Sequence, residues 1–377
     1  MRTWTRLILA AAALAAMSAQ AESTAKPAVI AGAQQMLVPN VGGRVRLSTT
    51  LTRTQGAVTI VTSSTYQWPG TYMEAAFMGP EVSVRLNDAA NILHVRIDGQ
   101  IVATLQRPGE IVKTFKDLGA GQHIIRVERL TESQGETGTF EGFFAPPGLA
   151  LAIHPHDRQI EFIGDSYTVG YGNTAGKTQC TRQEVADTTD TSQAFGPLTA
   201  THYRAEYQIN AISGRGIVRN YGGGEGDPLP VAYPYTLLDH TTSYINDDWH
   251  PQIIAIGLGT NDFSTPLHDG EKWKTRDDLH ADYEATYVKF VQDLRARYPK
   301  AYFILMAADQ FHGEMPGEIN EVIARLNSQG EQRIAFLPMT GLNFGGCDGH
   351  PDTGDDRTVS DELIAFIDQH PDIWQGK

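Results

Sequence analysis

The sequence predicts an all-β domain, a jelly-roll-like β-sandwich, followed by a three-layer α/β/α domain with a parallel sheet. Residues 44–144 alternate apolar and polar side chains with a period of two and are rich in β-branched residues. From residue 158 onward, short apolar runs alternate with stretches of helical periodicity. A chain of 377 residues with 41% hydrophobic content can bury one large core or two ordinary ones, so we expect two domains.

The first 21 residues have the composition of a secretory signal peptide. Arg2 and Arg6 precede an uninterrupted apolar run from Leu7 to Met17, and the sequence SAQA follows as far as Ala21. A membrane anchor is the alternative, but the run is too short to span about 30 Å of hydrocarbon. We therefore expect cleavage after Ala21, a secreted or periplasmic protein, and no membrane association after cleavage.

Charge excludes one class of partner. The formal net charge is −14, and removal of Arg2 and Arg6 with the signal makes it −16. An acidic surface repels the phosphate backbone of nucleic acids but does not obstruct a neutral substrate. We expect no nucleic-acid partner.

The two cysteines, Cys180 and Cys347, can form one disulfide in an oxidising compartment, and their pairing is then unambiguous. Two buried free thiols are the alternative. Two cysteines supply too few ligands for a cysteine-bound zinc site.

Residues 22–150 are predicted to form the sandwich after an N-terminal lead-in. The expected strands read VRLSTTL, AVTIVTSS, EVSVRLND, ILHVRIDGQIVATL and HIIRVERL. Asp98-Gly99 lies between two alternating runs and predicts a tight hairpin, because both residues tolerate positive φ. Residues 145–158 contain three prolines and predict a stiff, partly packed joint.

Residues 151–377 are predicted to form the α/β domain. Its expected strands, RQIEFIG, EYQINAIS, PQIIAIGLG, AYFILMA and QRIAFLPM, are short and continuously apolar, as strands covered on both faces should be. Helical spacing appears in SQAFGPLTATHYRA, HADYEATYVKFVQDLRARY, GEINEVIARLNSQ and RTVSDELIAFIDQH. In open sheets of this kind ligands bind at the carboxyl ends of the strands.

Polar residues follow three of these strands directly, and further polar residues lie in a loop near the C-terminus. They are found in Gly164-Asp165-Ser166, in Ser213-Gly214-Arg215-Gly216, in Gly259-Thr260-Asn261-Asp262, and in the loop GGCDGHPD with Asp348 and His350. A serine nucleophile needs a base, and the oxyanion that it generates needs preorganised donors. Each motif taken singly is an ordinary turn, cap or surface histidine. Their combination at the ends of strands of one sheet indicates a catalytic site.

These motifs, GDSYTVGYG, SGRGI, GTND and DGHP, resemble the blocks of the SGNH (GDSL-like) hydrolases. The resemblance covers residues 158–377. It implies that Ser166 is the nucleophile and His350 the general base. It also implies an oxyanion hole made by the main-chain N–H groups of Ser166 and Gly214 and the side-chain amide of Asn261.

The preceding sandwich extends the resemblance to carbohydrate esterase family two over nearly the whole mature chain. The segments that carry it are YQWPGTYMEAAF at 66–77, DTTDTSQAFGP at 187–197 and ISGRGIVRNYGG at 212–223. The resemblance implies an acetyl xylan esterase type of activity on xylan or glucomannan, in many members at the 6-O-acetyl position, and it implies no cofactor or metal.

One feature departs from the general SGNH pattern, which has an aspartate three residues before the histidine. Here Asp348 precedes His350 by two residues. We expect Asp348 to reach the imidazole around Gly349, and a main-chain carbonyl is the alternative partner.

Aromatic side chains are the expected sugar contacts, because sugar rings present apolar C–H faces. The candidates near the strand ends are Tyr167, Tyr221, Trp249, Phe263 and Trp273, with Arg215 as a hydrogen-bond donor. Arg215 has the alternative of pairing with an acid such as Asp165, and Asp262 is expected to cap a loop or helix. Trp68, in the sandwich, is expected either to bind glycan or to pack against the other domain.

The sequence is compatible with two alternatives to acetyl esterase activity. The same machinery can act on another acyl group, as in a lipase or thioesterase, although the sequence contains no amphipathic lid segment. The chain can also be a carbohydrate-binding protein with weak catalysis. The sequence leaves open the polysaccharide, the acetyl position and the oligomeric state.

Overall fold

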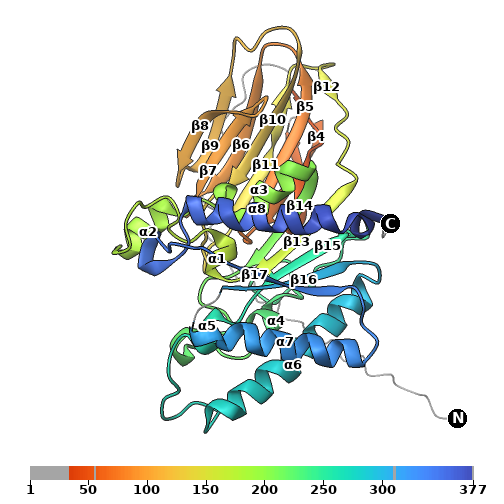
Figure 1. The fold of residues 1–377 in the computed structure, drawn as a ribbon. Helices are drawn as coiled ribbons and strands as arrows, with labels where there is room; N and C mark the ends of the chain where they lie inside the picture. Colours follow the sequence, from red (N-terminus) through yellow and green to blue (C-terminus); the bar gives the residue numbers. More distant parts are fainter. Residues whose placement is uncertain (1–33, 55–56, 309–310, 376–377) are drawn as a thin grey trace, which may run out of the picture. The chain divides into compact units, whose positions relative to one another are not determined.

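The structure, a computed structural model, describes residues 34–54, 57–308 and 311–375. The expected signal peptide, residues 1–21, lies outside the described residues. An antiparallel β-sandwich is followed by an α/β part with a parallel sheet (Figure 1), which confirms the predicted fold class. Within the described ranges, no helix combines the length and the apolar character needed to cross a bilayer.

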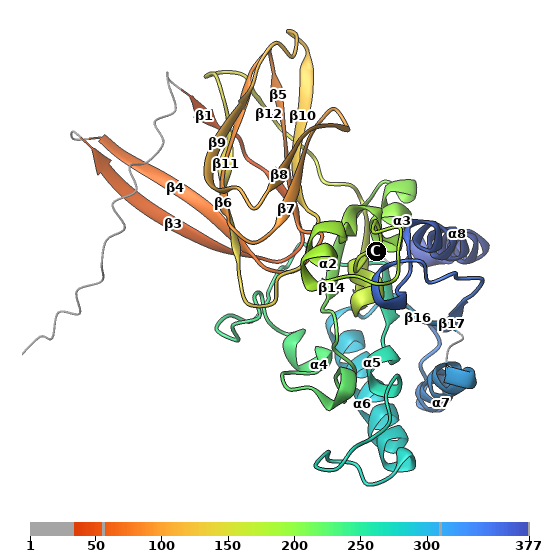
Figure 2. The same cartoon turned by 90° about the vertical axis from the view of Figure 1, so that its left-hand side faces the viewer.

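The sandwich consists of two six-stranded sheets. Its strands are β1 Gln35–Met36, β2 Asn40–Gly42, β3 Val45–Thr54, β4 Ala57–Tyr66, β5 Tyr72–Met78, β6 Val82–Asp88, β7 Ile92–Ile97, β8 Gln100–Gln106, β9 Gly109–Phe115, β10 Gln122–Arg129, β11 Gly138–Ala145 and β12 Ala150–Leu151. One sheet has the order β3-β4-β11-β6-β9 and the other the order β12-β5-β10-β7-β8. From β4 to β11 successive strands alternate between the sheets as in a jelly roll, except that β7 and β8 form a hairpin within one sheet. Figure 2 shows β3 and β4 as a long hairpin at the edge of the first sheet.

Local patterns predicted several of these strands. The Asp98-Gly99 turn joins β7 to β8, and both residues have positive φ, 53° and 80°. Strands β5, β9 and β11 are not among those expected from the sequence, and each pairs with a strand far away in the chain. The Pro-rich joint also contributes β12, which pairs with β5.

The α/β part has a five-stranded parallel sheet in the order β14-β13-β15-β16-β17. Its strands are β13 Arg158–Gly164, β14 Ala205–Ala211, β15 Ile253–Gly257, β16 Tyr302–Ala308 and β17 Ile334–Met339. The order reverses direction at β13, which therefore has β14 on one side and β15 on the other. A reversal of this kind places a crevice at the carboxyl ends of the central strands.

Helices cover both faces of the sheet. They are α1 Ser166–Val169, α2 Arg182–Thr188, α3 Phe195–Tyr203, α4 Leu229–Ala232, α5 Thr260–Phe263, α6 Arg276–Arg297, α7 Glu314–Ser328 and α8 Thr353–Gln369. Side chains of α3 and α8 share one apolar cluster, and those of α6 and α7 share another. Figure 1 shows the two pairs on opposite sides of the sheet.

The sandwich packs directly on the α/β part through buried side chains. Trp68 is fully buried within the apolar cluster of α6 and α7. Of the two roles expected for Trp68, the structure therefore shows packing against the α/β part. Arg44 lies over the rings of Tyr233 and Tyr244, at 4.2 Å and 4.4 Å from their centroids. Its guanidinium pairs with Glu161 of β13 at 3.2 Å, and both side chains are fully buried. A buried charge needs such a partner, which makes this contact specific.

Candidate active site

The four polar motifs meet at the carboxyl edge of the parallel sheet, around a cavity of about 710 Å³. Parallel strands end at the same edge, so residues just after β13, β14 and β15 come together although they are far apart in the sequence. The lining residues are Gln134, Ser166, Tyr167, Tyr171, Ser213, Gly214, Tyr221, Thr260, Asn261, Ser264, Asp348, Gly349 and His350.

Ser166 is the first residue of α1, directly after β13. Asp165 caps this helix, and its side chain accepts a hydrogen bond from the main-chain N–H of Tyr167. The Oγ atom of Ser166 lies 2.8 Å from Nε2 of His350. Ser166 is 96% buried, with its hydroxyl at the cavity wall. This geometry suits transfer of the hydroxyl proton to the imidazole.

The other ring nitrogen of His350 faces a main-chain oxygen. Nδ1 lies 2.9 Å from the carbonyl oxygen of Cys347. A carbonyl can only accept, so Nδ1 carries the proton and Nε2 presents its lone pair to Ser166. Burial lowers the pKa of His350, an effect opposed by the Cys347 carbonyl and the Asp348 charge, so the neutral base form persists to lower pH.

Asp348 does not occupy the position of the third member of a triad. Its Oδ2 atom accepts a hydrogen bond from the hydroxyl of Tyr171 at 3.0 Å, and its backbone is left-handed, with a φ of 54°. The Tyr171 ring lies over the His350 imidazole, with centroids 4.4 Å apart. The expectation that Asp348 reaches the imidazole is wrong for this structure. With only one residue between them, the carboxylate is directed towards Tyr171, and the carbonyl of Cys347 takes its place.

Asn261 is held at the cavity by two acceptors. Its Nδ2 atom lies 2.9 Å from the main-chain oxygen of Arg215 and 3.1 Å from Oδ2 of Asp165. Asp165 is buried, which raises its pKa to about 7. These contacts fix the position of the amide beside Ser166.

The loop after β14 is held by Asp262. Its two carboxylate oxygens accept hydrogen bonds from the main-chain N–H groups of Ile217, Val218 and Arg219 at 2.8–2.9 Å. Burial raises the pKa of Asp262 to about 6. The Asp262 side chain therefore caps a loop, which is the structural role expected from the sequence. The loop that it holds also includes Gly214.

Two family models match the chain, one on each part. The "Carbohydrate esterase 2 N-terminal" model matches residues 41–155, and the "GDSL-like Lipase/Acylhydrolase family" model matches residues 162–369. An acetylxylan esterase / glucomannan deacetylase of Cellvibrio japonicus (strain Ueda107) is 46% identical over 314 residues, 83% of this chain and 87% of that protein. The chain belongs to carbohydrate esterase family 2.

Solved structures agree with this membership. A carbohydrate esterase whose active site displays divergent catalytic and non-catalytic binding functions is similar to this chain with a TM-score of 0.84 and 43% identity, over 90% of this chain and 100% of that one. A family two carbohydrate esterase from Clostridium thermocellum in complex with cellohexaose is similar with a TM-score of 0.74 and 25% identity, over 89% and 100% of the two chains. This chain is thus a hydrolase of carboxylic esters.

The expected substrate-contact residues separate into two groups in this family 2 esterase. Tyr167 and Tyr221 line the cavity, and Tyr221 is 62% exposed. Arg215 follows the cavity residue Gly214 in the chain. The guanidinium of Arg215 donates to the main-chain oxygen of Glu225 at 2.6 Å and does not pair with Asp165.

Trp249, Phe263 and Trp273 are not among the residues that line the cavity. Trp249 precedes β15, at the amino ends of the strands, and its indole donates to buried Glu161 at 2.9 Å. Phe263 is buried against Tyr283, and the indole of Trp273 donates to Asp282 at 3.0 Å. These three side chains do not line the cavity, because packing directs Phe263 elsewhere and hydrogen bonds direct the two tryptophans elsewhere.

Three residues that line the cavity of the esterase, Gln134, Tyr171 and Ser264, were not expected from the sequence. Tyr171 lies five residues after Ser166, and the periodicity of that loop contains no signal for its stacking on His350. Gln134 comes from the loop between β10 and β11 of the sandwich, far from every motif of the α/β part. Only the packing of the two parts brings it to the cavity.

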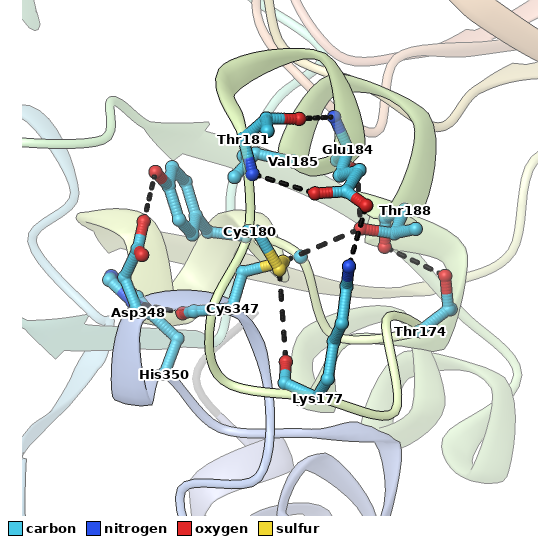
Figure 3. The surroundings of a disulfide bond; sticks show 12 residues. Thr174, Lys177, Cys180, Thr181, Glu184, Val185, Thr188, Cys347, Asp348 and His350 are labelled. Carbon is cyan, nitrogen blue, oxygen red and sulfur yellow. Dashed lines mark hydrogen bonds and ion pairs between the residues drawn. A yellow bond between two sulfur atoms is a disulfide. The ribbon is translucent and has the colours of Figure 1, made fainter.

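Cys180 and Cys347 form a disulfide across a sequence separation of 167 residues, with Cα atoms 5.5 Å apart. Figure 3 shows it joining the segment before α2 to the turn that carries Asp348 and His350. The same turn is held by a hydrogen bond from the N–H of Asp348 to the oxygen of Thr178 at 2.6 Å. A Cβ atom on Gly172 would lie 2.4 Å from Cβ of Cys347. The segment after Ser166 therefore packs closely on the residue whose carbonyl orients His350.

Proposed function

We propose that this chain is an exported serine esterase that removes O-acetyl groups from plant-wall polysaccharides such as xylan and glucomannan. The hydrogen-bonded series from Ser166 Oγ through His350 to the carbonyl of Cys347, beside an open cavity, carries the proposal. The 46% identity to an acetylxylan esterase / glucomannan deacetylase supports the substrate class.

In the proposed reaction, Ser166 Oγ attacks the acetyl carbonyl carbon while Nε2 of His350 takes the hydroxyl proton. The tetrahedral intermediate collapses by breaking its bond to the sugar oxygen, which receives the same proton from His350. An acetyl-Ser166 ester remains. Water, deprotonated by His350, then releases acetate and regenerates the serine.

The carbonyl of Cys347 has two parts in this cycle. It holds the neutral imidazole in the tautomer with a free Nε2 lone pair, and it lies next to the Nδ1–H when the ring becomes positively charged. An uncharged carbonyl stabilises the imidazolium less than a carboxylate does. We assign the oxyanion hole to the main-chain N–H groups of Ser166 and Gly214 and the amide of Asn261, three residues that line the cavity. The Asn261 amide donates to Arg215 and Asp165 in this structure, so one of its two N–H groups must turn to the oxyanion as the charge forms.

Tyr167, Tyr171 and Tyr221 are the proposed contacts for the sugar, because they contribute aromatic surface to the cavity. The finer proposal is a preference for 6-O-acetyl groups, which rests on the family resemblance alone. An NMR time course on a mixed acetylated glycan, following each acetyl position, tests it. Equal rates at all positions would contradict it.

Ser166→Ala is the test of the catalytic assignment. We expect loss of acetate release from both 4-nitrophenyl acetate and acetylated xylan, with an unchanged circular dichroism spectrum. Ser264→Ala, another cavity serine, is the matched control and should retain activity. More than trace activity in Ser166→Ala would refute the nucleophile. Faster hydrolysis of a 4-nitrophenyl ester of a long fatty acid, or of an acyl thioester, would favour the lipase or thioesterase alternative.

Non-catalytic glycan binding at the same site is a second candidate function. Its support is the similar carbohydrate esterase whose active site has both catalytic and non-catalytic binding functions, and the similar esterase in complex with cellohexaose. Calorimetric titration of the wild type and of Ser166→Ala with cellohexaose tests it, because cellohexaose carries no acetyl ester and the heat therefore reports binding without turnover. Absence of heat at millimolar cellohexaose would exclude this candidate.

Export is proposed from the composition of residues 1–21. Expression of the full chain in a secreting bacterial host should give a protein whose N-terminal residue is Glu22. Mass spectrometry of the cell-free fraction measures this directly. A product that keeps Met1–Ala21 and stays with the cells would contradict export.

A further inference from the structure

The loop between β10 and β11 of the sandwich contacts the α/β part at Ser213, beside the catalytic serine. Oε1 of Glu132 accepts a hydrogen bond from the main-chain N–H of Ser213 at 2.8 Å. Nε2 of Gln134 donates to the main-chain oxygen of the same residue at 2.9 Å. Two side chains of the sandwich thus hold both main-chain polar groups of one residue of the α/β part.

Ser213 and Gly214 are the central residues of a tight turn. The N–H of Arg215 donates to the oxygen of Ile212 at 3.2 Å, which closes the turn, and Gly214 has a φ of +81°. This φ at the third residue is that of a type II turn. A Cβ atom on Gly214 would meet nothing within 4 Å, so the glycine is required for its backbone angle and not for space.

Types I and II differ in the orientation of the central peptide, here the one between Ser213 and Gly214. Its C=O and N–H point in opposite directions because the peptide is trans. The hydrogen bond from Gln134 to the oxygen of Ser213 therefore determines where the N–H of Gly214 points. A flip of this peptide would break the hydrogen bond from Gln134, and the N–H of Gly214 would then point in the opposite direction.

Further contacts prevent the turn from moving as a unit. The N–H of Tyr221 donates to the oxygen of Gly214 at 2.9 Å. The guanidinium of Arg215 donates to Oε1 of Gln134 at 3.3 Å, so the Gln134 amide has its oxygen on Arg215 and its nitrogen on Ser213. Burial raises the pKa of Glu132, and its hydrogen bond with Ser213 opposes that shift.

We infer that Glu132 and Gln134 are positioning residues by which the sandwich fixes the Gly214 oxyanion donor of the α/β part. This inference rests on the proposed function, because it takes the N–H of Gly214 as part of the oxyanion hole. The sandwich then contributes to the rate of the chemical step itself and is more than an attached module.

Gln134→Glu in the full chain is the first test. A deprotonated glutamate has nearly the size of glutamine but cannot donate to the oxygen of Ser213. We expect kcat on 4-nitrophenyl acetate to fall by about 10-fold to 100-fold with little change in KM, since complete loss of one oxyanion donor costs about 100-fold to 1,000-fold. Glu136→Gln is the matched control, because Glu136 is an exposed residue of the same loop whose main-chain oxygen accepts from Ser133.

The substrate pair separates positioning from direct sugar binding. A positioning role lowers kcat on 4-nitrophenyl acetate and on acetylated xylan by the same factor. A rise in KM for xylan alone, with kcat on 4-nitrophenyl acetate unchanged, would overturn the inference and make Gln134 a sugar contact. That outcome would leave the proposed function intact, whereas a wild-type chain without esterase activity would refute the proposed function.

Amide hydrogen exchange supplies a readout that does not depend on turnover. We expect a peptide covering residues 212–216 to exchange faster in the double variant Glu132→Ala, Gln134→Ala, which removes both side-chain contacts with Ser213, than in the wild type, with unchanged exchange in α6. Glu136→Gln should exchange as the wild type does. Unchanged exchange at 212–216 in the double variant would refute the inference even if the enzyme had no measurable activity.

Discussion

Nδ1 of His350 donates its proton to the main-chain oxygen of Cys347 at 2.9 Å, and this contact replaces the carboxylate of a catalytic triad. Because the acceptor is part of the backbone, no substitution of the Cys347 side chain removes it directly. The orientation of the base instead depends on the turn 346–350 and on the residues that hold that turn.

Asp348→Asn should cost much less activity than His350→Ala. The Asp348 carboxylate contacts Tyr171 and not the imidazole nitrogen, so we expect kcat to fall by less than about fivefold, as for an exposed charge. Loss of the general base in His350→Ala should cost about 100-fold to 10,000-fold. Steady-state kinetics on 4-nitrophenyl acetate measures both, with Tyr171→Phe as the control for loss of the Asp348 contact. Equal losses in the two variants would restore Asp348 as a triad member.

The pH profile should report the lowered pKa of His350. Because neutral imidazole is the base, kcat/KM should fall as the pH drops through that pKa, at a pH below the ordinary histidine value of 6.5. The Asp348 charge favours imidazolium, so Asp348→Asn should move this acidic limb to still lower pH. A limb that moves to higher pH in Asp348→Asn would contradict the assignment.

Asp165 titrates in the same range, since burial raises its pKa to about 7. Its carboxylate accepts from Asn261 and not from His350, so the effect of Asp348→Asn on the limb identifies the histidine. The profile of Asp165→Asn is the control. If the acidic limb of the pH profile disappeared in Asp165→Asn, the limb would report the titration of Asp165 and not of His350.

The disulfide should stabilise both the fold and the base. The double variant Cys180→Ser, Cys347→Ser should lose about 2–4 kcal/mol of unfolding free energy, because the bridge closes a long loop in the unfolded chain. We also expect a lower kcat with a nearly unchanged KM, since the Cys347 carbonyl loses one restraint. Urea titration and kinetics measure the two effects. A thiol reductant should reproduce them in the wild type and have no effect on the double variant, and an unchanged kcat would limit the bridge to stability.

Trp68 should be a stability residue and not a glycan ligand. Trp68→Ala should lower the unfolding free energy by about 3–5 kcal/mol, because a fully buried side chain leaves a cavity between the sandwich and the α/β part. Val38→Ala, at a residue that is 81% exposed, is the control and should change stability little. Thermal unfolding and glycan pull-down on the folded full chain test both parts. Loss of glycan binding at unchanged stability would contradict this role.

The sequence by itself determined the fold class and the place of the site. Apolar runs alternating with helical periodicity predicted the parallel sheet, and every expected α/β strand is present. Ser166, Gly214 and Asn261 follow three of those strands, whose carboxyl ends must share one edge. Local patterns suffice for such features because periodicity and strand direction are properties of neighbouring residues.

Only the tertiary structure decided which groups touch. It assigned the carbonyl of Cys347 to His350, buried Trp249 beside Glu161, and brought Gln134 of the sandwich to Ser213. These contacts join residues on different elements or depend on one backbone angle, such as the left-handed φ of Asp348. They result from how whole elements pack against one another, and no local pattern of residue types contains that information.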